Sequence, residues 1–130
     1  MVEKYLSHIS GNIQEVIFVL GFIKAIIDAS HDADFGYSYD LDLAEASANV
    51  ESLLPDSALN PGKRVAFKIT SFSATYSWSL MTTGGQNIDE YSSGDITTLG
   101  LPEYNALYYF IEVEAKADGS GWNIVQKYSR

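Results

Sequence analysis

Hydrophobic and polar residues alternate most clearly over residues 72–80, where apolar side chains fill every second position and Ser or Thr fills the others. A period of two predicts a β-strand with one apolar face and one hydroxyl face. Over residues 65–69 the apolar positions have the opposite parity, and the switch falls at Thr70 and Ser71. Such an offset is typical of a β-bulge or of a bend between packed sheets. We therefore predict a bent strand over 65–81.

Most of this predicted strand is also free of charge. No charged residue occurs between Lys68 and Asp89. Exposed edge strands usually carry a Lys, a Pro or another feature that prevents unwanted pairing. We therefore expect the 65–81 strand to be central and paired on both sides.

Alternation predicts three further strands. Residues 35–43 combine an apolar side with an acidic one, and residues 107–117 have apolar odd positions. The Asp-Gly-Ser-Gly sequence at 118–121 predicts a hairpin turn that leads into a last strand over 122–128. The long irregular region 82–102 leaves room for a short strand over 96–99.

The N-terminal part is harder to interpret. Residues 1–11 fit a short helix that stops at Gly11. Residues 13–28 fit either a helix or a strand that is apolar on both faces, and periodicity does not distinguish them. The many β-branched residues and Gly21 favour a strand, whereas the length of the segment favours a helix.

We therefore predict a mainly β fold, an antiparallel two-sheet sandwich with a short N-terminal helix. If residues 13–28 form a strand, residues 29–34 become a hairpin loop. The alternative fold is α+β, with a helix over 4–28 packed on a curved antiparallel sheet. With its Gly-Trp-Asn-Ile-Val sequence at 121–125, this cone-like alternative resembles nuclear-transport-factor-2-like domains in fold alone.

Composition narrows the class of protein. The 130 residues, of which 46% are hydrophobic and 19% charged, suit one globular domain over 1–130. The net charge of −9 argues against binding to nucleic acid. Residues 16–27 are too few to cross a bilayer, so we expect no membrane insertion. The chain has no cysteine, which fits a cytoplasmic protein and is also compatible with export.

Acidic residues suggest one candidate site. No Lys or Arg occurs between Lys24 and Lys63, and this interval contains a cluster of Asp28, Asp32 and Asp34. Carboxylate oxygens are the ligands that Ca²⁺ prefers, so these residues are a candidate calcium site. Their spacing departs from the calcium-loop pattern, and a solvated acidic loop is the alternative interpretation.

Catalytic motifs are missing from the sequence. It contains no Gly-x-Ser-x-Gly elbow, no His-Glu-x-x-His and no glycine-rich phosphate loop. His31 is one of two histidines, and a nucleophile, base and stabilising group cannot be named together. We therefore do not predict an enzyme.

Aromatic residues provide a second candidate site. Tyr76, Trp78 and Tyr108 could line a pocket for a carbohydrate or a small apolar ligand, with packing in the core as the alternative. We predict a non-catalytic binding or self-assembly module, with a protein partner or a second copy as ligand. A small-ligand or enzymatic cone domain and a calcium-dependent binding module are the alternative functions.

Overall fold

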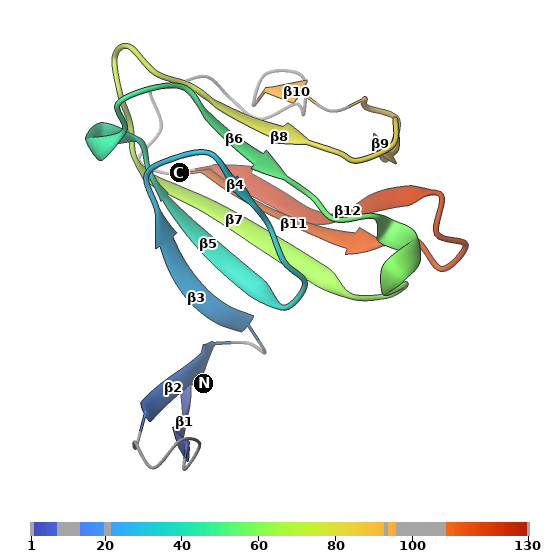
Figure 1. The fold of residues 1–130 in the computed structure, drawn as a ribbon, viewed down its shortest axis with the longest axis horizontal. Helices are drawn as coiled ribbons and strands as arrows, with labels where there is room; N and C mark the ends of the chain where they lie inside the picture. The colour runs from blue at the N-terminus through green and yellow to red at the C-terminus, as the bar shows by residue number, and fades with distance from the viewer. Residues whose placement is uncertain (1, 8–13, 20–21, 93, 96–108, 130) are drawn as a thin grey trace.

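Two β-sheets packed face to face make up most of the molecule, which contains almost no helix (Figure 1). The structure is a computed structural model that describes residues 2–7, 14–19, 22–92, 94–95 and 109–129. Its helical segments are two short 3₁₀ turns, η2 (Leu43–Glu45) and η3 (Ser57–Leu59). The prediction of a mainly β fold is therefore confirmed.

The large sheet has eight strands of mixed direction, in the order β1-β2-β3-β5-β7-β11-β12-β9. Their bounds are β1 (Val2–Ser7), β2 (Gln14–Val19), β3 (Phe22–Ile27), β5 (Tyr37–Asp42), β7 (Arg64–Ser71), β11 (Tyr109–Ala115), β12 (Gly121–Ser129) and β9 (Asn87–Ile88). Strands β3, β5 and β7 pair in parallel, whereas β7, β11 and β12 pair antiparallel. The predicted antiparallel pairing thus holds for only part of the sheet.

The small sheet has the order β10-β8-β6-β4. It consists of β4 (His31–Asp32), β6 (Val50–Leu53), β8 (Trp78–Met81) and β10 (Gly94–Asp95). Strands β4, β6 and β8 are parallel to each other, and β10 pairs antiparallel with β8.

Between β3 and β8 the chain alternates between the two sheets. Strands β3, β5 and β7 enter the large sheet, and β4, β6 and β8 enter the small one. Each turn of the chain adds one strand to each sheet, next to the strand from the previous turn. This winding explains the parallel pairing, since successive strands of one sheet are separated by a passage through the other.

The core lies between the sheets. Its largest fully buried side chains are Phe67 of β7, Trp78 of β8, Tyr109 of β11 and Trp122 of β12. Strand β8 illustrates how alternate positions face the core, since Trp78 and Leu80 are buried while Ser79 and Met81 are only partly buried.

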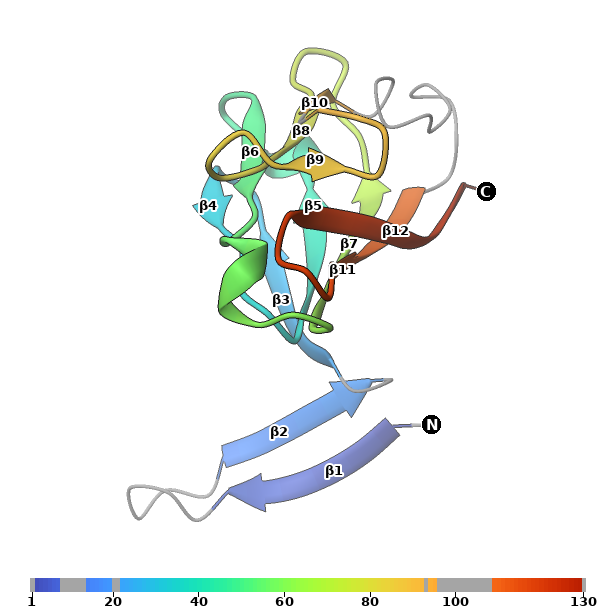
Figure 2. The ribbon, with the colours of Figure 1, turned by 90° about the vertical axis from the view of Figure 1, so that its right-hand side faces the viewer.

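The N-terminal helix is not found. Val2–Ser7 forms β1, which pairs antiparallel with β2, and residues 4–28 contain no helix in the described ranges. Residues 13–28 contribute two strands, as their β-branched residues favoured, so the cone-like alternative is wrong. The predicted hairpin loop at 29–34 is also wrong, because the chain crosses to the small sheet through β4 and returns to pair β5 in parallel with β3. Strands β1 and β2 form a ribbon that extends away from the two packed sheets (Figures 1 and 2).

The 65–81 segment bends between the sheets, as predicted, but it forms two strands. Strand β7 pairs with β5 and β11, and β8 pairs with β6 and β10. Between them, the hydroxyl of Ser73 accepts hydrogen bonds from the backbone N–H groups of Thr75 and Tyr76 at 3.0 Å each. A side chain that bonds the neighbouring backbone competes with strand pairing, so the alternation over 72–77 did not produce a strand.

Candidate binding surface

The outer face of the large sheet, which is turned away from the small sheet, carries two lines of side chains across five strands. Strand pairing sets the first line as Lys24, Ser38, Ala66, Glu112 and Gln126. These residues come from β3, β5, β7, β11 and β12. Because Ser38 and Ala66 are small, the middle of this line lies low in the sheet surface.

The second line runs beside the first, two residues away on each strand. It consists of Ile26, Asp40, Lys68, Phe110 and Tyr128. Phe110 and Tyr128 stack on each other, with ring centroids 5.1 Å apart. This line therefore forms a wall along one side of the small residues, and Phe22 stands on the other side.

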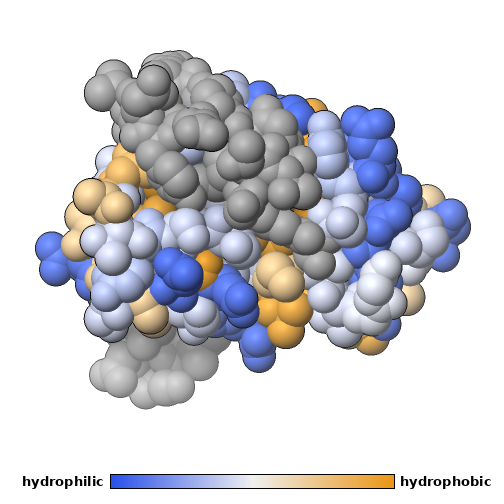
Figure 3. All heavy atoms as spheres, turned by 90° about the horizontal axis from the view of Figure 1, so that it is seen from above, coloured by the Kyte–Doolittle hydropathy of each residue, from blue (hydrophilic) through white to orange (hydrophobic). Residues whose placement is uncertain are grey.

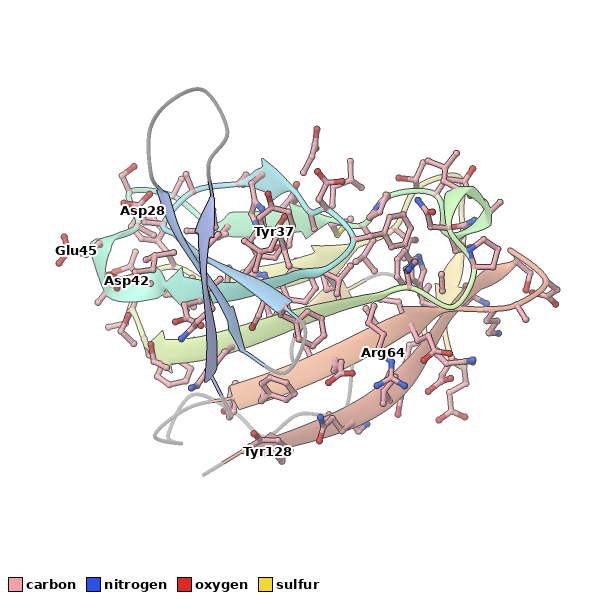
Figure 4. All side chains as sticks on the ribbon, turned by 90° about the horizontal axis from the view of Figure 1, so that it is seen from below. Asp28, Tyr37, Asp42, Glu45, Arg64 and Tyr128 are labelled. Atoms are coloured by element: carbon pink, nitrogen blue, oxygen red, sulfur yellow. The ribbon has the colours of Figure 1, made fainter. Side chains whose placement is uncertain are left out.

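Two hollows result from this arrangement. One has a volume of about 300 Å³ and lies over Ser38 and Ala66 between Phe22 and Phe110. The other, of about 460 Å³, shares Phe22, Glu112 and Gln126 with the first and continues to Lys63 and Arg64. Figure 4 shows this face from below, with Arg64 and Tyr128 on it and the β1–β2 ribbon passing in front.

Ion pairs hold the charged residues of the outer face in place. Arg64 donates from Nη1 to Glu112 at 2.9 Å and from Nε to Glu114 at 2.8 Å. Both bonds raise the pKa of Arg64 above its ordinary value, and the bond to Glu114 has the larger effect. Glu112 is only 4% exposed and also accepts a bond from Gln126 at 2.9 Å. Lys24 lies 3.4 Å from Asp40.

Basic side chains outnumber acidic ones in the two hollows of the outer face. Two acidic residues, Asp40 and Glu112, line the hollows. Four basic residues line them as well: Lys24, Lys63, Arg64 and Lys68. The strands of the small sheet contain no Lys or Arg. The lining of these two hollows thus has a formal charge of +2 (four basic minus two acidic residues), on a chain with a net charge of −9.

Strand β3 presents an open edge beside this face. Its pairing with β2 is confined to Ile23 and Phe22, so in the described part of the chain β2 leaves the sheet there. Ile23 donates its N–H to the carbonyl of Gly36 at 2.8 Å. Along a strand, the N–H and C=O groups of successive residues point to opposite sides. The N–H and C=O groups of Lys24 and Ile26 therefore point away from β5. The side chain of Ile26 is 78% exposed.

A polar cluster lies on the opposite side, within the small sheet. Ser52 is fully buried, and its hydroxyl lies 2.7 Å from His31 Nε2 and 2.9 Å from Trp78 Nε1. The indole N–H can only donate, so Ser52 accepts that bond and can donate its own proton to His31. Burial lowers the pKa of His31 below its ordinary value of 6.5, against the opposing effect of Asp32. This cluster has the composition of a catalytic dyad, but Ser52 is closed off from solvent.

Of the three aromatic residues predicted to bind a ligand, the structure describes Tyr76 and Trp78. Trp78 is 1% exposed and packs against Phe67 in the core, with ring centroids 5.4 Å apart. Tyr76 is half-buried in the segment before β8, and Tyr108 lies outside the described residues. The predicted short strand over 96–99 lies outside them as well.

The three predicted calcium ligands lie along one stretch of chain. Asp28 follows β3, Asp32 is on β4 and exposed, and Asp34 donates its backbone N–H to the Tyr39 hydroxyl at 2.8 Å. Among the described residues, no group of three His, Asp or Glu side chains is placed to hold a metal ion.

Sequence reasoning missed most of the outer face. It did not find that β3, β5 and β7 are parallel neighbours, which aligns Lys24, Ser38 and Ala66. The available signal was the grouping of Lys63, Arg64 and Lys68 around one strand after a long interval without basic residues.

Comparison with known proteins adds no family. The sequence matches no protein-family model and no curated protein. Within the described ranges, the chain has no helix of the length and apolar character needed to cross a membrane.

Proposed function

We propose that the protein is a non-catalytic binding module whose outer face binds an acidic protein surface. The observation that carries this proposal is the excess of basic over acidic side chains in the two hollows of the outer face. Basic residues gather in the hollows of the outer face, while the rest of the chain is strongly acidic. A positive surface attracts a negative partner and disfavours a positive one, which gives the interaction its orientation.

The exposed apolar groups of the same face supply the second part of an interface. Ile26 is 78% exposed and Tyr128 is 40% exposed, and both belong to the second line of side chains. Apolar residues surrounded by charged ones are typical of protein-binding surfaces. The open edge at Lys24 and Ile26 also offers backbone groups to an extended segment of a partner.

A labelled peptide tests the proposal. The probe is a fluorescent decapeptide of alternating Glu and Leu, and the control probe has Lys in place of Glu. We expect fluorescence anisotropy to show binding of the acidic probe alone, which weakens as salt is added. In the variant Lys24→Glu with Lys63→Glu, the affinity should fall at least tenfold.

The matched control is Lys116→Glu with Lys127→Glu, which changes the net charge equally. Lys116 follows β11, and Lys127 lies over the ring of Tyr91, 5.4 Å from its centroid, rather than in the hollows. This variant should retain most of the affinity. Equal losses in both variants, or no binding by the wild-type protein, would contradict the proposal.

A further inference from the structure

The side of the small sheet that faces away from the core, which we call the small-sheet face, complements the outer face in charge and in apolar character. Strand pairing places Asp32, Leu53 and Met81 in one line across β4, β6 and β8. Glu51 and Ser79 form the neighbouring line. Asp32 and Glu51 are exposed, and Leu53 is 38% exposed.

A hollow of about 500 Å³ lies on this face. Its lining includes Asp32, Glu51, Leu53 and Met81, with no Lys or Arg. Figure 3 views the molecule from this side, and in its coloured part hydrophilic and apolar residues lie next to each other. The small-sheet face is thus acidic and partly apolar, whereas the hollows of the outer face carry more basic than acidic side chains beside apolar ones.

The two faces lie on opposite sides of the molecule, because each is the side of its sheet that is turned away from the other sheet (Figure 1). The outer face of one copy can therefore meet the small-sheet face of another while its own small-sheet face stays available. Such a contact joins two different surfaces, so further copies can add to the stack one after another unless the copies close into a ring. Two outer faces would bring Lys24, Lys63 and Arg64 of both copies together, which disfavours a symmetric pair.

We propose that the acidic partner is a second copy of this chain, and that copies stack head to tail with the outer face of one on the small-sheet face of the next. This inference rests on the proposed function, since it names the partner of the same surface. The β1–β2 ribbon extends on the side of the outer face (Figures 1 and 4), so the incoming copy would also meet the ribbon. Strand β2 contains four consecutive apolar residues, a pattern typical of a strand covered on both faces.

Two charge-reversed variants test the stack. Variant A is Lys24→Glu with Lys63→Glu on the outer face, and variant B is Asp32→Lys with Glu51→Lys on the small-sheet face. Light scattering should show that the mass of the wild-type protein rises above 14.3 kDa with concentration at low salt and falls back in 1 M NaCl. Each variant alone should remain monomeric, with self-association at least tenfold weaker.

Mixing the variants gives the decisive measurement. In an equimolar mixture, the reversed outer face of A meets the reversed small-sheet face of B, and the two unchanged faces also match. We expect the mixture to regain the wild-type mass. A circular dichroism spectrum and a melting curve establish that A and B are folded; if either is not, Lys24→Gln and Glu51→Gln replace the reversals, and each should weaken association.

The outcomes separate this inference from the proposed function. If the wild-type protein stays monomeric to about 1 mM at low salt, or if variant B associates like the wild type, the stack is wrong. The outer face then still binds the acidic peptide if the proposed function is right. If the mixture fails to regain association although both variants are folded, the two faces do not contact each other.

Discussion

Replacing Ser52 by Ala removes the centre of the buried polar cluster. The hydroxyl of Ser52 is the shared partner of the Trp78 indole N–H and of His31 Nε2. Trp78 is 1% exposed, so its N–H has no access to water after the change. His31 is only half-buried, and its Nε2 can recover part of its hydration.

The expected loss of stability follows from these two groups. A buried polar group left without a partner costs about 1–3 kcal/mol. The Trp78 N–H should incur most of this cost and His31 a smaller share, so Ser52→Ala should lower the free energy of unfolding by about 2–4 kcal/mol. Because the replacement leaves only a small void, we attribute nearly all of the loss to the broken bonds.

Urea unfolding at pH 7.5, followed by tryptophan fluorescence, measures the effect. The midpoint should fall with little change in the slope. Ser79→Ala, on the neighbouring strand β8 but at the half-buried outer side, is the matched control and should change stability by less than about 0.5 kcal/mol. In Trp78→Phe, which already lacks the indole N–H, Ser52→Ala should cost less than in the wild type. A Ser52→Ala variant as stable as the control would refute the reasoning.

Two other predictions concern pH and backbone contact. Since burial lowers the pKa of His31, the unfolded chain binds its proton more readily, so stability should be constant above pH 6.5 and fall as the pH drops below this value. Urea titrations between pH 7.5 and 5 should show a smaller decline in His31→Gln, and an unchanged decline would count against the prediction. Gly121→Ala would place a Cβ 2.7 Å from the carbonyl oxygen of Asn87, where β12 meets β9. We expect a loss of about 1–3 kcal/mol in thermal melts, and wild-type stability would show that β9 moves away at no cost.

The strands were largely predictable because each depends on a local pattern. Alternation located β5, β11 and β12, and the parity switch at Thr70 and Ser71 located the end of β7. The lack of charge after Lys68 correctly indicated strands paired on both sides. These signals require only that one face of a strand is buried and the other is not.

The pairing of strands was not predictable in the same way. A run of apolar residues does not state which strand lies beside it, so β3 and β5 were expected to form a hairpin rather than a parallel pair. The outer face depends on this pairing, because residues 24, 38 and 66 become neighbours only when three strands lie in parallel register. The candidate site was therefore hidden for the same reason as the topology.

For Trp78, composition alone left two interpretations open. A tryptophan among serines on a strand fits an exposed platform as well as a core position. The structure decides for the core, since Ser52 lies on the adjacent strand and accepts the indole N–H. This partner lies 26 residues away along the chain, so no local pattern reveals it.

The alternation of strands between the two sheets also sets the order in which the molecule can fold. Strand β7, in the middle of the large sheet, needs β11 as a neighbour, and their pairing joins Arg64 to Glu114 across 50 residues. Pairing two strands that are so far apart in the sequence closes a large loop. The chain loses conformational entropy in this closure before the paired strands add stability, which slows folding. During synthesis, strands β3 to β8 therefore leave the ribosome before β11 and β12 can complete the large sheet. Their apolar residues stay accessible to contact with other chains until β11 and β12 have paired.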